Sequence, residues 1–395
     1  MNNRQLFLQH LGQTSEFPLL IEIERAEGIY MYGPDEKVYT DLIAGIGVSN
    51  VGHRHPNVVK ALHDQIDKYM HVMVYGEFVQ TPQVQLGKTL ASLLPDHLNC
   101  SFLVNSGSEA NEGAIKLAKR FTGRPEIISC HNAYHGSTNG ALSITGEESL
   151  KANFRPLLPE IKHITFNDIM ELDAITEHTA AFIMEPVQGE AGVISATQKY
   201  MDAVRAKCNQ TGTLLIFDEV QCGAGRTGRM WAHEHYNVTP DIMTVAKGIG
   251  GGMPIGAFIS SQEIMKVLQN DPILGHITTF GGHPVCSAAA NACLTTLTED
   301  SLLKDVPVKA QRFIDKLKHP SIKEIRHLGL MMAVEFESFD VLKPIIDKAI
   351  EKGVVTDWFL FNDFSMRIAP PLTITFEEID QSCKTILDAI TETLH

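Results

Sequence analysis

Residues 242–257 read IMTVAKGIGGGMPIGA, an apolar run of strand type that leads into a single lysine, Lys247, and then into a cluster of glycines. One interpretation is a strand that ends at the surface with a solvated charge, followed by a flexible loop. The other is an amine held in a cleft at the carboxyl end of a strand, where glycines let the backbone approach a ligand closely. The neighbouring stretches of sequence distinguish between these two interpretations.

Short apolar runs alternate with helical patterns between about residue 100 and residue 260. The strand candidates are residues 101–104, 126–130, 180–187, 213–220, 242–247 and 256–261, and helical patterns occupy residues 109–120 and 198–212. This alternation predicts an α/β fold with a mostly parallel central sheet and helices on both faces. Ligands bind such sheets beyond the carboxyl ends of the strands, which favours the cleft interpretation of Lys247.

The pattern of strand-like and helical segments changes after about residue 290. Residues 324–337 and 365–375 read as strands, whereas residues 339–353 and 376–395 read as helices, the last with a capping box of Thr375 and Glu378. We therefore expect three parts in the chain. They are an N-terminal segment, 1–45, that packs with the small domain, a large cofactor-binding α/β domain, 46–290, and a small α+β C-terminal domain, 291–395.

Composition excludes several classes of protein. The 395 residues carry a formal net charge of −14, which argues against a nucleic-acid surface. The apolar stretches are too short to span a bilayer, and the first residues lack the pattern of a signal peptide. Seven cysteines without a C-x-x-C pair indicate reduced thiols and a cytoplasmic protein.

A carboxylate pair follows the strand candidate at residues 213–220. The run TLLIFDEV places Asp218 and Glu219 at its carboxyl end, where a buried carboxylate is costly unless a cation meets it. That cation could be a nearby arginine such as Arg226. It could also be the protonated ring nitrogen of a cofactor, and with Lys247 as an amine that captures an aldehyde, the pair describes pyridoxal phosphate.

The stretch LVNSGSEANEGAIKLAKRF, residues 103–121, offers a place for the phosphate. Ser106 and Glu109 have the spacing of a capping box, and the backbone amides of Gly107 and Ser108 would point at an anion at the start of the helix. An ordinary capped helix would look the same. The apolar face of this helix is predicted at Ala110, Ala114, Leu117, Ala118 and Phe121.

Two further patterns invite other functions. Residues 223–228, GAGRTG, match the G-x-G-x-x-G of a dinucleotide site, but the helix that such a site needs is not predicted after them. An NAD-dependent oxidoreductase is therefore a remote alternative. The histidine pairs of GHRHP and WAHEHY have no third ligand at sensible spacing, so no metal site is predicted there.

Taken together, these stretches resemble the class III pyridoxal-phosphate aminotransferases, especially the acetylornithine and ornithine aminotransferase subgroup. The likeness runs nearly end to end and includes AGIGVSNVGHRHPNV, NSGSEANE, YHGST, EPVQGEAG, IFDEVQCGAGRTG, AKGIGGGMPIGA, TTFGGHPV, GLMMAVE and MRIAPPLTIT. The resemblance implies the type I, aspartate-aminotransferase-like fold and a homodimer with shared active sites. It also implies a ping-pong reaction that moves a terminal amino group from an ornithine-like donor to 2-oxoglutarate.

The resemblance assigns roles to residues at matching motif positions. Lys247 would hold the cofactor covalently and carry protons, and Asp218 would pair with the ring nitrogen. Gln221 would contact the phenolic oxygen, while Val220 and Tyr134 would cover the two ring faces.

The phosphate and the substrates would be held by a second group of residues. Gly107 and Ser108 would hold the phosphate, together with Thr279 from the neighbouring subunit. For the substrates, Arg367 would grip a carboxylate of the acceptor, Glu190 would pair with that arginine while the donor binds, and Thr278 is a further candidate.

One departure from the family pattern concerns the donor. Where acetylornithine and ornithine enzymes usually read H-G-R-T, this chain reads His135-Gly136-Ser137-Thr138, so the arginine that normally holds the donor carboxylate is Ser137 here. The donor is therefore left open. Two alternatives with the same fold remain, a glutamate-semialdehyde aminomutase and a diamine aminotransferase. A binding protein without catalytic activity is a further alternative.

Overall fold

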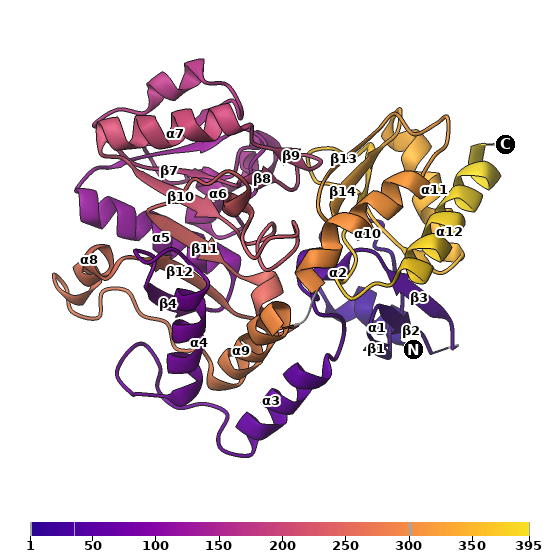
Figure 1. Ribbon diagram of the computed structural model, residues 1–395, viewed down its shortest axis with the longest axis horizontal. Helices are drawn as coiled ribbons and strands as arrows, with labels where there is room; N and C mark the ends of the chain where they lie inside the picture. The colour runs from indigo at the N-terminus through magenta and orange to yellow at the C-terminus, as the bar shows by residue number, and fades with distance from the viewer. Residues whose placement is uncertain (1, 35, 300–301, 395) are drawn as a thin grey trace.

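The structure is a computed structural model that describes residues 2–34, 36–299 and 302–394. Figure 1 shows a larger part built around a central sheet and a smaller part that holds both ends of the chain. The arrangement places the carboxyl ends of the central strands near the junction of the two parts.

The larger part is built on a seven-stranded sheet with the order β4-β12-β11-β10-β7-β5-β6. Only β12 runs against its neighbours, β4 and β11, so the sheet is mostly parallel as predicted. The six predicted strands are confirmed. The strand β6 was not predicted, because the lysine and the histidine in its sequence, IKHI, interrupt the apolar pattern. The bounds are β4 (Cys100–Val104), β5 (Glu126–Cys130), β6 (Ile161–Ile164), β7 (Thr179–Met184), β10 (Leu214–Asp218), β11 (Ile242–Val245) and β12 (Gly256–Ser260).

Helices cover both faces of this sheet, which confirms the predicted layering. The helix α5 (Gly107–Thr122) shares one apolar cluster with Ile183, while α7 (Gln198–Thr211) shares another with Phe182, its neighbour on the same strand. Successive strand residues point to opposite faces, so the two helices lie on opposite sides of the sheet. One expectation for α5 is wrong, because Phe121 is 37% exposed rather than part of its buried face.

A third group of helices joins the sheet to the smaller part. The helix α9 (Pro284–Glu299) packs on α3 (Pro56–Ile66) and α4 (Thr81–Ser92) (Figure 1). Its Leu297 belongs to an apolar cluster that contains Val245 of β11 and Ile386 near the C-terminus. The two parts of the chain therefore share one continuous apolar core.

The smaller part contains a three-stranded antiparallel sheet covered by helices. The strand order is β13-β14-β16, with β13 (Glu324–Leu328), β14 (Met331–Glu335) and β16 (Ser365–Ile368). The helices are α10 (Leu302–Lys316), α11 (Phe339–Glu351) and α12 (Phe376–Leu394). The predicted capping box before α12 is confirmed, because Thr375 Oγ1 accepts from the Glu378 amide and the Glu378 carboxylate accepts from the Thr375 amide.

Strands from the two ends of the chain meet in a separate sheet of order β1-β2-β3-β15. Its members are β1 (Arg25–Glu27), β2 (Tyr30–Tyr32), β3 (Val38–Asp41) and β15 (Val354–Val355), the last parallel to β3. The predicted boundary at residue 290 falls within α9. The three-part division of the chain stays a prediction.

Short elements complete the chain. They are α1 (Asn3–His10), α2 (Ala44–Gly47), α6 (Asn139–Ile144), α8 (Gln262–Met265), β8 (Val187–Gln188) and β9 (Ile194–Ser195). No helix in the described part of the chain has both the length and the apolar character that a membrane crossing requires.

Candidate active site

A cavity of about 430 Å³ lies beyond the carboxyl ends of the parallel strands. It is lined by the turn after β4, by Asp218 at the end of β10, and by Ala246 and Lys247 just after β11. Of the predicted site residues, the lining includes Gly107, Ser108, Tyr134, Asp218, Val220, Gln221 and Lys247. The structure thus brings together seven of the predicted residues, which come from four separate stretches of sequence.

Lys247 stands in a strained backbone conformation at the edge of this cavity. Its φ is +45°, in the left-handed region that few residues with a Cβ adopt, and a short 3-10 turn, Lys247–Gly250, begins on it. Among the described residues, none forms a hydrogen bond or an ion pair with its amine. Burial lowers the pKa of Lys247, while the Glu190 carboxylate acts to raise it. The amine is therefore easier to deprotonate than an ordinary surface lysine, as a nucleophile requires.

Asp218 is buried and held in place by hydrogen bonds from several elements. Its Oδ2 accepts from Asn111 Nδ2 and pairs with His135 Nδ1, both at 2.8 Å, and its Oδ1 accepts from the Val220 amide at 3.0 Å. The alternative of a salt bridge to Arg226 is wrong, because that guanidinium donates to the Leu330 and Pro370 carbonyls and to Asn50. No described lysine or arginine pairs with Asp218, so its oriented carboxylate can meet a cationic ligand.

The turn between β4 and α5 has the geometry of an anion site. No described group accepts from the backbone amides of Gly107 and Ser108. The expected capping box is only half formed: Ser106 Oγ accepts from the Glu109 amide at 3.2 Å, whereas the Glu109 carboxylate accepts from the amide of Asn105 at 2.6 Å. The free amides at the start of a 16-residue helix favour an anion there.

The walls of the cavity are formed by Tyr134, Val220 and Gln221. The Tyr134 amide donates to Glu185 at 3.1 Å, and its hydroxyl lies 3.2 Å from Ser137 Oγ. Gln221 Nε2 donates to Glu190 Oε1 at 3.0 Å, which ties the cavity wall to a neighbouring ion pair.

That ion pair joins Arg367 on β16 to Glu190. The two Nη atoms of Arg367 each donate to one Glu190 oxygen at 2.9 Å, and both side chains are only 4% exposed. Burial alone would raise the pKa of Glu190, but Arg367 and Gln221 lower it to about 2. The Glu190 carboxylate therefore stays charged at neutral pH.

Five of the predicted site residues do not line the cavity with the others. Glu190 and Arg367 lie beside it, joined through Gln221. Ser137 is exposed near Tyr134, and Thr278 is half-buried with its Oγ1 accepting from Asn105 Nδ2 at 3.2 Å. A fifth residue, Thr279, is exposed on the outside of this chain.

The cavity lining also includes Asn111, His135 and Glu185, to which no role was assigned from the sequence. His135 Nε2 is buried without a hydrogen-bond partner among the described residues. Burial raises the pKa of Glu185 to about 7, although its carboxylate accepts the amides of Tyr134 and Gly189. Asn111 and His135 belong to the quoted stretches NSGSEANE and YHGST, and no spacing rule connects them to Asp218.

The two sequence patterns set aside above take up structural roles. Residues 223–228 form turns and are followed by a short 3-10 helix, Ala232–His235, rather than by an α-helix that could open on a dinucleotide. Of the histidines, His53 pairs with Asp41 and His55 caps α3, while His233 binds Glu219 and His235 binds Thr227.

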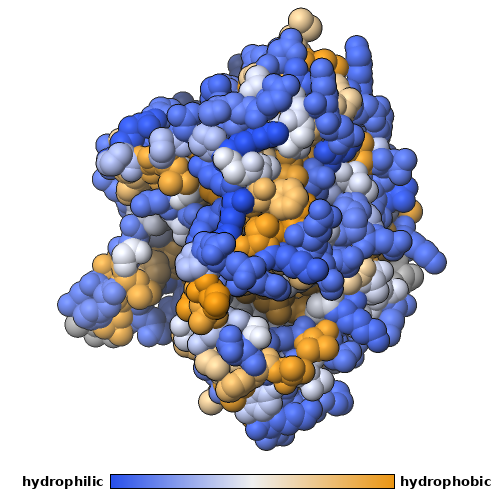
Figure 2. All heavy atoms as spheres, turned by 90° about the vertical axis from the view of Figure 1, so that its left-hand side faces the viewer, coloured by the Kyte–Doolittle hydropathy of each residue, from blue (hydrophilic) through white to orange (hydrophobic). Residues whose placement is uncertain are grey.

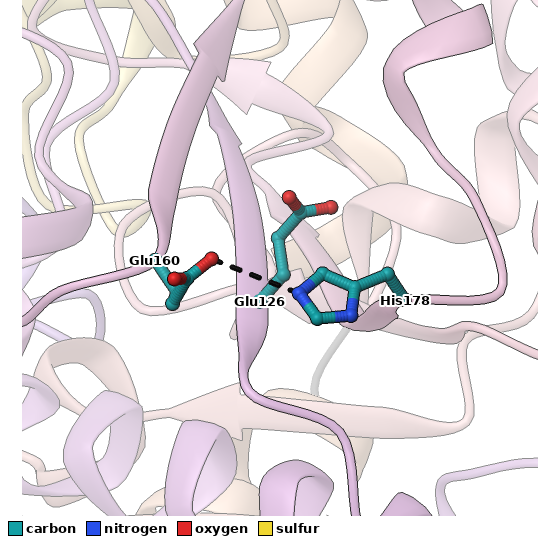
Figure 3. A group of neighbouring side chains, drawn as sticks. All are labelled: Glu126, Glu160 and His178. Atoms are coloured by element: carbon teal, nitrogen blue, oxygen red, sulfur yellow. Dashed lines mark ion pairs between the residues drawn. The ribbon is translucent and has the colours of Figure 1, made fainter.

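Glu126, Glu160 and His178 form a separate cluster of potential metal ligands among the described residues (Figure 3). They lie at the amino ends of β5, β6 and β7, whereas the cavity lies beyond the carboxyl ends of the strands. Lys162 already pairs with Glu126, and Glu160 and His178 are exposed, so we do not assign a metal site there.

Comparison with known proteins places the chain in one family. A family model described as "Aminotransferase class-III" matches residues 12–390. The curated acetylornithine aminotransferase of Methanocaldococcus jannaschii is 43% identical over 97% of this chain and 96% of its own length. The putrescine aminotransferase of Pectobacterium atrosepticum is 39% identical over 89% of this chain and 78% of its own length.

Solved structures agree with this placement. A transaminase from the marine bacterium Virgibacillus superposes with a TM-score of 0.92 at 28% identity, over 99% of this chain and 98% of that one. The ornithine aminotransferase from Toxoplasma gondii superposes with a TM-score of 0.91 at 29% identity, over 99% and 96%. The chain therefore has the type I fold of pyridoxal-phosphate enzymes, as predicted.

The chemistry of the cavity fits pyridoxal phosphate. Within the described part of the chain, it offers an amine without a partner, an oriented carboxylate and two backbone amides without acceptors. It also has close approaches that only glycine allows: a Cβ at Gly107 would lie 2.8 Å from Val220, and one at Gly136 would lie 2.0 Å from Ser108 Oγ. With its family match and relatives over nearly the whole length, this chain belongs to the class III aminotransferases, which use pyridoxal phosphate.

Proposed function

We propose that this protein transfers a terminal amino group from an ornithine-like donor, such as acetylornithine or ornithine, to 2-oxoglutarate by a ping-pong mechanism. The observation that supports it most is the single cavity lined by Lys247, Asp218 and the turn at Gly107. Relatives named acetylornithine aminotransferase, at 43% and 37% identity, support the donor class.

The proposed chemistry depends on two side chains. Bound pyridoxal phosphate supplies a ring that withdraws electrons from the carbon bearing the donor's amino group. Asp218 would keep the ring nitrogen protonated and the ring electron-poor. Lys247 Nζ would hold the cofactor and, when free, would take the proton from the carbon that bears the donor's amino group.

Other residues hold the cofactor in place. The amides of Gly107 and Ser108 would bind the phosphate, and Thr279 of a second copy of the chain would complete this site. Val220 and Tyr134 would cover the two faces of the ring. Gln221 would donate to its phenolic oxygen.

Arg367 is proposed to bind a carboxylate of 2-oxoglutarate after Glu190 moves aside. Glu190 covers the Nη atoms of Arg367 while the donor binds, so the site can accept two substrates that differ in charge. Replacing Arg367 by alanine removes one partner of a buried, hydrogen-bonded charge pair, a truncation that costs about 2–5 kcal/mol. We expect Arg367→Ala to slow the acceptor half-reaction far more than the donor half-reaction, as measured by single-turnover kinetics. Equal slowing of both halves would instead assign Arg367 to the donor or to the fold.

Ser137 is proposed to weaken selection for a donor carboxylate, with Thr278 as a further substrate residue. A serine can donate one neutral hydrogen bond, whereas an arginine would form a bidentate, charged pair. The two basic residues that follow in sequence do not replace it, because Lys151 donates to the Thr145 carbonyl and Arg155 pairs with Glu148. Neither lines the cavity.

A diamine is therefore the second candidate donor. It lacks a carboxylate altogether, and a relative at 39% identity is named putrescine aminotransferase. A glutamate-semialdehyde aminomutase has no such support among the relatives described above.

The donor assignment can be tested with a Ser137→Arg variant assayed against acetylornithine, ornithine and putrescine. Hydrogen bonds to charged groups contribute about 1.5–3 kcal/mol, so the variant should gain roughly 10- to 150-fold in kcat/KM for acetylornithine. Putrescine, which has no carboxylate to pair, should gain nothing. If wild type already uses acetylornithine efficiently and the arginine adds nothing, another residue holds the carboxylate and the specificity argument is wrong.

We also propose that the protein is a homodimer. Exposed apolar side chains gather in two stretches, at Ile66, Met70, Val72, Phe78, Val79 and Val84, and at Ile273, Leu274, Ile277 and Phe280. Phe78, Val79 and Val84 of the first stretch, together with Phe102, line a cavity of about 330 Å³ that opens at the surface. Figure 2 shows hydrophobic groups of side chains gathered on the side of the molecule where α4, α5 and α8 lie. An apolar surface of this kind marks an interface, and a second copy there could supply Thr279.

A cytoplasmic location is part of the same proposal. All seven cysteines are free, and six of them are buried. Reduced thiols are typical of a reducing compartment.

A further inference from the structure

A second carboxylate, that of Asp357, also pairs with Arg367. It contacts a different edge of the guanidinium group from the edge that Glu190 contacts. Arg367 Nε donates to Asp357 Oδ1 at 2.8 Å, while its two Nη atoms donate to Glu190. One buried cation therefore has two carboxylate partners. Asp357 can keep its contact when Glu190 leaves.

The segment that carries Asp357 fixes the plane of the guanidinium. The Trp358 carbonyl accepts from Nη2 at 3.2 Å, and the Phe359 ring lies with its centroid 4.4 Å from the guanidinium carbon. These contacts do not involve Glu190. They leave the fork of Nη atoms pointing at the place where Glu190 now lies, so an incoming carboxylate can bind in the same geometry.

The pair of Glu190 and Arg367 is nearly inaccessible to water, so an unpaired charge at this place would be costly. Asp357 is less buried, with a side chain 22% exposed. Burial raises the pKa of Asp357 to about 6, even though Arg367 acts to lower it. At pH 7 and above, Asp357 is therefore mostly ionised.

Opening of the Glu190 pair would otherwise leave Arg367 as a buried, unpaired charge, which is strongly unfavourable. We propose that Asp357 is a positioning residue that keeps Arg367 paired while Glu190 moves aside and the acceptor enters. This inference rests on the proposed function, in which Arg367 binds the acceptor carboxylate. Asp357 repels Glu190 and the acceptor carboxylate about equally, because both occupy the same Nη edge. The charge of Asp357 should therefore change the rate at which the acceptor enters much more than it changes the acceptor's affinity.

The test compares wild-type holoenzyme with Asp357→Asn, which keeps an oxygen acceptor for Nε but removes the charge. In single-turnover experiments, the acceptor half-reaction with 2-oxoglutarate should slow by about 10- to 100-fold, and the donor half-reaction should change less than about 3-fold. Glutarate, a dicarboxylate that cannot react, should associate and dissociate more slowly in proportion, with its Kd within about 3-fold of the wild-type value.

Two further variants separate charge from structure. Asp357→Ala should behave like Asp357→Asn, because both remove the charge. Asp380→Asn removes a carboxylate from another arginine pair in the same part of the chain, that with Arg312, and should leave both half-reactions unchanged.

Four results would overturn the inference. If Asp357→Ala is slow and Asp357→Asn is normal, the hydrogen bond matters rather than the charge. If both half-reactions slow equally, Asp357 supports the fold. If wild type does not accept 2-oxoglutarate, the proposed function fails and the inference with it, whereas normal acceptor use with unchanged Asp357→Asn rates overturns the inference alone.

Discussion

Replacing Lys247 by alanine is expected to abolish transamination, with a fall in turnover of more than about 10³-fold. The amine is the group that anchors the cofactor and moves the proton, and no other described lysine lines the cavity. The fold should remain intact, because alanine and lysine both carry a Cβ and meet the same strain at a φ of +45°. Turnover with a donor and 2-oxoglutarate, measured together with the thermal unfolding midpoint, checks this result.

Lys309→Ala is the matched control. Lys309 is also a buried lysine whose pKa is lowered by burial, but its amine donates to the Leu372 carbonyl in the smaller part of the chain. That variant should lose stability and keep its turnover per folded molecule. Normal turnover in Lys247→Ala would remove Lys247 from the mechanism.

The Asp218→Asn variant should keep the cofactor and lose most of its rate, on the order of 100-fold or more. The amide is nearly the same size as the carboxylate, so the packing around Asn111 and His135 is preserved. It cannot hold a proton on the ring nitrogen, and the ring then withdraws electrons poorly. Absorbance of the bound cofactor and kcat at saturating substrates measure the two effects separately.

Glu219→Gln provides the comparison at the next position. The Glu219 carboxylate accepts the amides of Ala232 and His233 and does not line the cavity. Its replacement should lower stability more than rate. Near-normal activity in Asp218→Asn would show that the ring nitrogen does not depend on that carboxylate.

The central sheet could be predicted because each of its buried strands is a short apolar run bounded by a turn. The run IKHI at β6 escaped prediction, since its lysine and histidine break the apolar pattern that marked the other six strands. Phe121 was expected on the buried face from helical spacing alone. It lies in the last turn of α5, where the neighbouring elements no longer cover it.

The residues near the cofactor were accessible to prediction for a related reason. Lys247, Asp218 and Gly107 lie at or just after the carboxyl ends of strands, where a parallel sheet gathers its ligand-binding groups. Their roles stay predictions, although the structure brings them into one cavity.

Residues that meet only through the tertiary fold were beyond the reach of local patterns. Glu190 and Arg367 are 177 positions apart, and their pairing came from family resemblance. Asn111 and His135 converge on Asp218 from two other elements. Asp357, ten positions before Arg367, lies in a segment whose shape the sequence pattern does not reveal.

The central claim is that Lys247 holds the cofactor covalently. The most direct measurement is to supply the purified protein with pyridoxal phosphate, reduce it with borohydride, digest it, and find the peptide that carries the cofactor. We predict that reduction fixes the cofactor on the peptide containing Lys247, and that the Lys247→Ala variant gives no labelled peptide. A label on any other lysine, or a protein that carries no cofactor when supplied with pyridoxal phosphate, would contradict the account.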